Sequence, residues 1–491
     1  MLVGLFLTPF YIRTLGQNDY GIWLVGLQVL TFLLLVDFGL VGIVPRDIAH
    51  ASGLEKSEPE TDRLAILVTQ TTKVVLFQTL IVALVSFGLF FLRPSNPSLR
   101  GPIGLVLAVF VLSYPLRLFP AVLQGLQDLK FLGQLRIWLW ALSAALIVIL
   151  LMLGARFYAL ACGWCLQQLA HDLVAFLRLR RIRPNLLTLE VWKRSRPVKW
   201  RWFLRGFWVS VSQTAYSLLS GADILIMARF LGPASVVVYS CTSKLVTILS
   251  NQPQILASTA LPGLSQMKTS ESRERILQTT TSLTQAMILL VGGIVCIVLA
   301  VNRQFITLWL GPQFFGGMIL TGLLVVNYLF RQIDNTLAVA LFALGYEKLS
   351  AIRCLIDAIV SVALASLFIR WWGARGVVLG FLISAIFVAI PIDGFLFMRE
   401  FKVSVFQLFR PYLPYLWRVA LIGSLGVLLT MRVSIPSVFT VVTTVVSVGL
   451  AYLLFVIPHA WRSPLGSYLQ AATTALRSGM RSRLLGWSNN S

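Results

Sequence analysis

The chain has 491 residues, of which 57% are hydrophobic and only 12% are charged, and its mean hydropathy is +0.83. A soluble globule of this length needs more polar surface than such a composition supplies, so the chain is expected to lie in a lipid bilayer. The net charge of +23 would suit nucleic-acid binding, but most of the 41 Lys and Arg lie in alternate loops between hydrophobic stretches. This is the positive-inside pattern of a membrane protein, so nucleic acid is not expected as a partner.

Hydrophobic stretches follow one another along the chain, and most reach the roughly 20 residues that a helix needs to cross a bilayer. The sequence predicts about fourteen such spans: 1–11, 20–44, 64–92, 102–126, 137–154, 157–177, 206–228, 235–262, 281–302, 317–345, 349–369, 376–398, 416–431 and 437–458. The first is too short to span, so we expect a truncated start. The predicted fold class is an all-α polytopic membrane protein.

Short motifs recur in the two halves of the chain at an offset of roughly 216 to 220 residues. Gly154-Ala155-Arg156 returns as Gly373-Ala374-Arg375, Arg13-Thr14-Leu15-Gly16 resembles Arg229-Phe230-Leu231-Gly232, and Gly125 matches Gly345. A repeat with an even number of spans keeps its orientation in the bilayer. We therefore expect two six-helix bundles related by a pseudo-twofold axis along the membrane normal, with substrate bound between them.

Five segments are predicted: an N-terminal six-helix bundle (1–177), a basic interfacial linker (178–205), a C-terminal six-helix bundle (206–398), two additional transmembrane helices (399–458) and a basic amphipathic tail (459–491). The Lys and Arg asymmetry puts the linker, the tail and both termini in the cytoplasm. The linker and the tail mix cations with apolar residues and are expected to lie on anionic membrane lipids; regulatory or partner binding is the alternative.

Ionisable residues within spans are functional candidates, because a charge at bilayer depth is costly unless it faces protein or water. In span 102–126, Arg117 shares one helical face with Gln124. In span 317–345, Asn327, Arg331 and Asn335 recur at four-residue steps. Each span thus carries one polar face.

Two interpretations of the intramembrane cations stay open. Arg117, Arg331 and Lys244, which is near the middle of span 235–262, could line a cavity between the bundles and attract a multiply charged anion such as a pyrophosphate. They could instead form interhelical salt bridges or extend toward the membrane surface.

Carboxylates within spans are candidates for proton or sodium coupling, for a place in the cavity, or for pairing with those cations. These carboxylates are Asp37, Asp223, Asp334, Asp357 and Asp393; Asp223, Asp334 and Asp37 are the candidates for coupling or the cavity, and for Asp37 a packing or gating role is favoured. His171-Asp172 is expected at the cytoplasmic interface without a special role. No cofactor and no metal site are expected, because all five cysteines fall within spans and are interpreted as packing residues.

Four segments together resemble the polysaccharide and O-antigen flippases of the multidrug/oligosaccharidyl-lipid/polysaccharide exporter superfamily. They are TPFYIRTLGQNDYGIW, LLLVDFGL, ADILIMARFLGPASVVVYS and FITLWLGPQF. The resemblance implies twelve core helices, often with two more, in the plasma (inner) membrane. It also implies that the chain moves a polyprenyl-diphosphate-linked oligosaccharide from the cytoplasmic to the outer leaflet for cell-surface polysaccharide synthesis. Polysaccharide assembly proteins are the protein partners to expect. Arg117, Lys244 and Arg331 fit the cationic cavity of that family by type and depth.

Two alternatives remain at this point. A cation-coupled multidrug antiporter of the same superfamily would usually carry acidic residues early in its first bundle, and residues 1–11 have none. A membrane-embedded polysaccharide polymerase or glycosyltransferase would be expected to have a large catalytic loop, whereas the outward loops are short and no phosphate-binding glycine loop or nucleophile triad is visible. The sequence therefore predicts a transporter rather than an enzyme.

Overall fold

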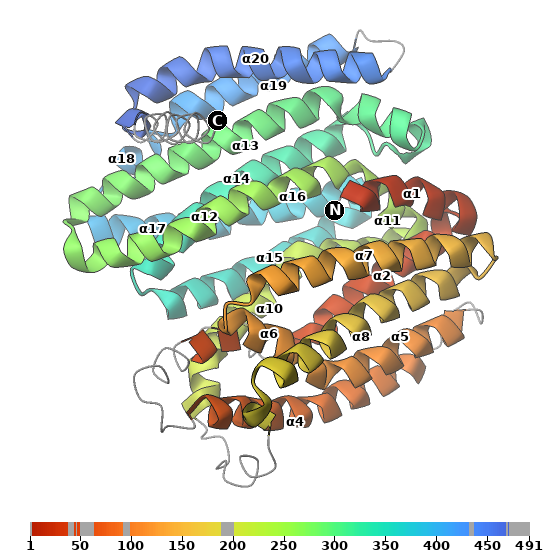
Figure 1. Ribbon diagram of the computed structural model, residues 1–491. Helices are drawn as coiled ribbons and strands as arrows, with labels where there is room; N and C mark the ends of the chain where they lie inside the picture. The colour runs from red at the N-terminus through yellow and green to blue at the C-terminus, as the bar shows by residue number, and fades with distance from the viewer. Residues whose placement is uncertain are drawn as a thin grey trace, which may run out of the picture. The chain divides into compact units, whose positions relative to one another are not determined.

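The computed structural model describes residues 2–37, 44–45, 47–49, 63–91, 99–187, 201–431, 437–467 and 470, and every regular element in this part of the chain is helical. The chain divides into two compact units (Figure 1). We call Phe10–Ser217 the N unit, and Leu218–Ser491 together with Met1–Pro9 the C unit. The boundaries fall inside the first and the tenth helix, so each of these two helices contributes to both units.

The N unit is built on a series of helices in which α4, α5, α8 and α7 pack consecutively. Leu30 and Leu33 of α2 join a buried cluster with α4, α5 and α8. In chain order the elements are α1 (Leu2–Leu15), α2 (Gln17–Leu33), η1 (Leu34–Asp37), α4 (Arg63–Phe91), α5 (Arg100–Ser113), η3 (Tyr114–Arg117), α6 (Leu118–Gly125), α7 (Leu129–Met152), α8 (Arg156–Ile182), η4 (Pro184–Leu187) and the first part of α10 (Arg201–Leu231).

The C unit is organised around α13, against which α12, α14, α19 and α20 pack (Figure 1). After α10 its elements are α11 (Pro233–Thr242), α12 (Lys244–Ser270), α13 (Arg273–Trp309), η5 (Pro312–Phe314), α14 (Met318–Ala343), α15 (Glu347–Trp372), α16 (Ala374–Ser384), the π-helical η6 (Ala385–Ala389), α17 (Ile390–Phe401), α18 (Val405–Phe409), α19 (Leu413–Met431) and α20 (Val438–Arg462). Gly292 permits the close contact with α20, because a Cβ there would lie 2.6 Å from Oη of Tyr452.

The all-helical membrane fold predicted from the sequence is confirmed. Each of the fourteen predicted spans contains a helix, although residues 38–43 of the second lie outside the described residues. In the described chain, eight helical spans are long and apolar enough to cross a membrane, or nine when the α11–α12 pair, bent by 55°, counts as one. The others coincide with α1, α2, α8, α14 and α19, which are shorter or more polar, so the total of fourteen stays a prediction.

The division into five segments also stays a prediction. Residues 188–200 of the predicted basic linker lie outside the described residues, as do 468–469 and 471–491 of the predicted tail. Within the described part, residues 178–187 belong to α8 and η4 and residues 201–205 begin α10.

The internal duplication is visible in the turns that connect the helices of the two units. Gly16 precedes α2 with a φ of 86°, and Gly232 precedes α11 with a φ of 85°. Gly154 follows α7 and Gly373 follows α15, again with positive φ, of 81° and 56°. Only glycine adopts these backbone angles without strain, which explains why these residues recur in both halves.

One of the three sequence matches is wrong. The turns after α6 and α14 are closed by the same three backbone hydrogen bonds, at an offset of 218 residues. After α6 these bonds run from Leu126 N to Val122 O, from Gln127 N to Gln124 O and from Asp128 N to Leu123 O. After α14 they run from Leu344 N to Ala340 O, from Gly345 N to Phe342 O and from Tyr346 N to Leu341 O. The counterpart of Gly345 is therefore Gln127, which also has a positive φ, and not Gly125. Gly125 is small for another reason, since a Cβ there would lie 2.7 Å from the carbonyl oxygen of Pro45.

Candidate functional site

Two prolines shape the span that carries Arg117. Pro115 and Pro120 lack the N–H that would continue the α-helical hydrogen bonds, and between α5 and α6 the backbone tightens into the 3-10 turn η3. Arg117 is the last residue of this turn, and its guanidinium carbon lies 5.5 Å from the ring centroid of Tyr114, which is buried. The break in the helix thus fixes where the cation lies.

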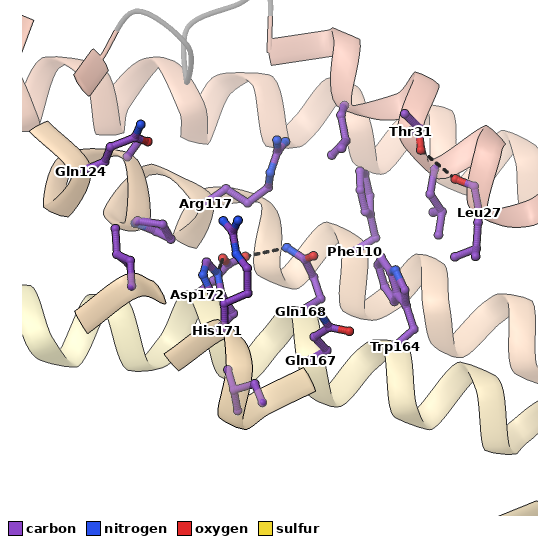
Figure 2. Close-up of a pocket in the computed structure, with 17 residues that line it drawn as sticks. Leu27, Thr31, Phe110, Arg117, Gln124, Trp164, Gln167, Gln168, His171 and Asp172 are labelled. Carbon is purple, nitrogen blue, oxygen red and sulfur yellow. Dashed lines mark hydrogen bonds and ion pairs between the residues drawn. The ribbon is translucent and has the colours of Figure 1, made fainter. Parts of the chain in front are cut away.

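Arg117 lines a cavity of about 710 Å³ whose walls come from four segments of the N unit (Figure 2). This volume is within the range of about 300–1,000 Å³ found for small-molecule sites. The lining residues are Leu27, Leu30, Thr31 and Leu34 from α2 and η1; Phe110, Arg117, Pro120, Ala121 and Gln124 from α5, η3 and α6; Leu132, Arg136 and Leu139 from α7; and Trp164, Gln167, Gln168, His171 and Asp172 from α8.

Cations outnumber carboxylates among the lining residues. Arg117 is partly buried, and Arg136 forms no ion pair with any residue that the structure describes. Asp172 is 2% exposed; its carboxylate accepts a hydrogen bond from Nε2 of Gln168 at 2.8 Å and lies 3.0 Å from Nδ1 of His171. Two arginines and one carboxylate therefore line the cavity, which suits an anionic ligand.

The wall formed by α8 is held firmly against α7 beside the cavity. Ser143 of α7 donates a hydrogen bond to the carbonyl oxygen of Gly163 at 2.8 Å, and a Cβ at Gly163 would lie 2.2 Å from Cγ1 of Ile147. At the end of α8, Nε of Arg178 lies 3.1 Å from Oδ2 of Asp128 in the turn before α7. These contacts fix the position of α8 on both sides of its polar residues.

The C unit contains a buried charged cluster made by α14, α15, α16 and α17. Arg331 pairs with Asp357 and also donates hydrogen bonds to Oγ of Ser361 at 3.0 Å and to the carbonyl oxygen of Phe381 at 2.9 Å. Asp357 is fully buried, and it accepts a further hydrogen bond from Ser384 at 2.6 Å. The charge of Arg331 is therefore neutralised within the C unit.

A second arginine in the cluster faces two carboxylates. Arg353 donates a hydrogen bond to Oδ2 of Asp334 at 2.9 Å, and its Nε lies 3.2 Å from Oδ1 of Asp393. All three side chains are at most 7% exposed. The π-helical turn η6 and Pro391, which has no N–H to donate, immediately precede Asp393 in the last span of the cluster.

The remaining predicted site residues lie at several places. Lys244 begins α12 at the bend after α11 and forms no ion pair with any described residue. Asp223 of α10 accepts a hydrogen bond from Oη of Tyr239 at 2.6 Å. Asn327 of α14 has a buried Oδ1 that meets no hydrogen-bond donor in the described chain. Asn335 is partly buried next to Asp334 on α14, and Asp37 is the last residue of η1.

The structure brings Arg117 together with Gln124 in the cavity, and Arg331 together with Asp334 in the cluster. The predicted joint site of Arg117, Lys244 and Arg331 involves both units and stays a prediction. Sequence reasoning missed Arg136, because the predicted span began one residue after it, and gave His171-Asp172 no special role. A usable signal was present in α8, where polar and aromatic residues recur at helical spacing from Trp164 to Asp172.

Comparisons with known proteins agree on this architecture. The structure resembles the lipid II flippase MurJ in an inward closed conformation, with a TM-score of 0.61 and 12% identity over 93% of this chain and 99% of that one. A MATE structure in a bent conformation matches with a TM-score of 0.55 and 15% identity, covering 80% and 94% of the two chains. At these identities the matches show the fold alone.

The sequence also has relatives. A Shigella flexneri protein assigned as an O-antigen transporter is 21% identical over 393 residues, which cover 78% of this chain and 90% of that protein. The family model described as polysaccharide biosynthesis protein matches residues 1–268. Fold and cavity define a multi-pass helical membrane protein of the kind that the MurJ and MATE structures represent. The chain belongs to the polysaccharide biosynthesis protein family.

Proposed function

We propose that this protein moves a polyprenyl-diphosphate-linked oligosaccharide from the cytoplasmic to the outer leaflet of the plasma (inner) membrane by alternating access, for cell-surface polysaccharide synthesis. The observation that carries this proposal is the N-unit cavity, which is lined by Arg117, Arg136 and a single carboxylate. A diphosphate diester has two negative charges and oxygens that match guanidinium groups. Membership of the polysaccharide biosynthesis family supports a saccharide-linked substrate.

The finer parts of the proposal concern partners and topology. Both termini lie in the cytoplasm, and the linker and tail rest on anionic lipids, as their cations suggest. Polysaccharide assembly proteins are the partners that would supply or take up the substrate. The protein acts as a transporter rather than as an enzyme, so it leaves the covalent structure of its substrate unchanged.

The coupling ion in this proposal is a proton held between Asp334 and Asp393. The charged cluster contains three carboxylates, of Asp334, Asp357 and Asp393, but only two guanidinium groups. Asp334 and Asp393 both contact Arg353, and each has a carboxyl oxygen that meets no hydrogen-bond donor in the described chain. A shared proton would supply that donor and balance the charge, and its release could drive a conformational change.

The central test compares flipping by the intact chain, by Arg117→Ala/Arg136→Ala and by the matched variant Arg180→Ala, which removes an exposed arginine of α8 outside the cavity. Cells lacking the protein are expected to accumulate lipid-linked oligosaccharide accessible only from the cytoplasmic side. The intact chain and Arg180→Ala should reverse this accumulation, and the double variant should not. If the double variant also reverses it, the cavity is not the site. Unchanged lipid-linked oligosaccharide with altered sensitivity to cationic drugs would instead support the antiporter alternative.

A further inference from the structure

One face of α8 carries an unusual set of side chains for a helix within a membrane protein. Trp164, Gln167, Gln168, His171 and Asp172 recur at intervals of three and four residues, and all five line the N-unit cavity. Polar groups at bilayer depth are costly unless they meet water or a ligand. The charge of Arg117 and Arg136 explains the attraction of a diphosphate but not why the wall formed by α8 carries amides and an aromatic ring.

Part of this face is held by internal hydrogen bonds and part is left available. Gln168 and His171 both contact the carboxylate of Asp172, which fixes all three side chains. Gln167 makes no hydrogen bond with any described residue, and Nε2 of His171 is buried without a partner among them. Unused donors and acceptors of this kind, next to a fixed carboxylate, match sugar hydroxyls, which donate and accept at the same atom.

Trp164 adds an apolar platform to the same face. Its ring stacks on Phe110 of α5, with centroids 6.4 Å apart and an interplanar angle of 26°. A tryptophan held in this way presents a rigid, flat surface with little loss of conformational entropy on binding. Since the ring also lines the cavity, it offers that surface to the apolar C–H face of a pyranose.

The two kinds of wall lie side by side. In Figure 2, Arg117 is in the centre, with Phe110 and Trp164 to its right and Gln168, His171 and Asp172 below. A sugar joined directly to a diphosphate must lie within one bond of the group that the guanidinium holds. A cavity of about 710 Å³ has room for such a headgroup but not for a long glycan.

We propose that the face of α8 formed by Trp164, Gln167, Gln168, His171 and Asp172 is a sugar subsite that binds the first saccharide attached to the diphosphate. This proposal rests on the proposed function, since the diphosphate at Arg117 and Arg136 brings the sugar to the subsite. Sugars further along the oligosaccharide lie outside the cavity and contribute little to recognition. The subsite thus makes the residue nearest the lipid the one that the protein selects.

The test measures binding of defined probes to the purified full-length chain in lipid nanodiscs. The reference probe is farnesyl diphosphate whose terminal phosphate carries a methyl ester, called farnesyl diphosphate below, and the sugar-bearing probes carry glucose, galactose, N-acetylglucosamine or N-acetylgalactosamine in place of the methyl group. All of these probes are diphosphate diesters with two negative charges, so they differ only in the sugar. At least one sugar-bearing probe is expected to bind about tenfold more tightly than farnesyl diphosphate, because its sugar gains one or two hydrogen bonds and a stacking contact. Trp164→Ala and Gln167→Ala should each reduce that ratio several-fold while leaving the affinity for farnesyl diphosphate unchanged, and Trp164→Phe should retain part of it.

Matched controls come from the same unit. Trp138→Ala and Gln134→Ala remove exposed residues of α7 that do not line the cavity, and both should keep the wild-type ratio. Binding of farnesyl diphosphate without any gain from a sugar, or a gain that survives both subsite substitutions, overturns the subsite and leaves the proposed function standing. Failure of all probes to bind contradicts the diphosphate site itself, and the subsite with it.

Discussion

The two repeats use equivalent helices in opposite ways. In the N unit, α5–α6, α7 and α8 contribute walls to a cavity that is lined by two arginines and one carboxylate. In the C unit, their counterparts α14, α15 and α16–α17 close over a cluster in which each arginine is neutralised. At the offset of 218, Arg117 corresponds to Asn335 and Ser113 to Arg331. The arginine thus lies one helical turn earlier in the C unit than in the N unit. This shift accompanies the difference between a cavity in the N unit and a buried charged cluster in the C unit.

The comparison shows that a charged residue within a span can either form a buried ion pair or line a cavity. Amino-acid composition alone does not distinguish these two roles. A buried ion pair is costly to break, because removing one partner leaves the other charge uncompensated. A cation that lines a cavity stands where water can take its place, so its removal is expected to cost less. Stability and transport measurements should therefore respond differently to substitutions in the two regions.

The largest effect on stability is expected for Arg331→Ala. This change leaves the fully buried Asp357 without its charge partner and should lower the free energy of unfolding by about 3–5 kcal/mol. The measurement is thermal unfolding in detergent, followed with a thiol-reactive dye that reports exposure of the buried Cys241, Cys296 and Cys354. The double variant Arg331→Leu/Asp357→Leu is the control and should recover much of the loss. An unchanged Tm for Arg331→Ala would contradict the interpretation that Arg331 and Asp357 neutralise each other in a buried pair.

Arg117→Ala should show the reverse behaviour. Its side chain is only partly buried and lines the cavity, so the free energy of unfolding is expected to change by no more than about 1 kcal/mol. Flipping in proteoliposomes should fall at least about tenfold, as expected when a charge-assisted contact with the substrate is lost. A large loss of stability with normal flipping by the remaining folded protein would reverse the assignment of roles to the two regions.

Asp393→Asn tests whether the cluster holds a proton. If Asp393 shares a proton with Asp334, the neutral amide should be tolerated, with a change in unfolding free energy of about 1 kcal/mol or less. Flipping in proteoliposomes should then lose its response to an imposed pH difference across the membrane, while the intact chain keeps it. Destabilisation as large as that of Arg331→Ala would show that Asp393 is a permanently charged partner of Arg353 instead.

The smallest effect concerns the equivalent turns after α6 and α14. Gly345→Gln should cost about 1–2 kcal/mol, because a residue with a Cβ is strained at positive φ and would also crowd Nζ of Lys268. Gln127→Gly at the matching position should be neutral or slightly stabilising, since that glutamine already has a φ of 65°. Thermal unfolding of both variants measures the difference, and equal effects would argue against the structural equivalence of the turns.

The helical membrane fold, the duplication and the polar faces of two spans could be predicted from the sequence. The length of a hydrophobic stretch and the spacing of residues along a helix can both be read directly from the order of the residues. The sequence was not enough to distinguish Arg117, which lines a cavity, from Arg331, which is neutralised by Asp357. That distinction depends on which neighbouring helix presents a carboxylate. Asp357 belongs to a different span from Arg331, so no spacing within one helix reveals the pair. The sequence also did not reveal that Gln127 is the counterpart of Gly345. The two residue types differ, and the match depends on the backbone hydrogen bonds of the turn.

Nε1 of Trp309 in α13 donates a hydrogen bond to the carbonyl oxygen of Leu5 at 2.7 Å, so the start of α1 is tied to the C unit by a residue 304 positions later. A ribosome adding about 5–20 residues per second needs roughly 15–60 s to make the intervening chain. During that interval the first helix must wait in the membrane, or in the insertion machinery, without its final partner. Biogenesis of this protein therefore has a step that cannot be completed until more than half of the chain has been synthesised.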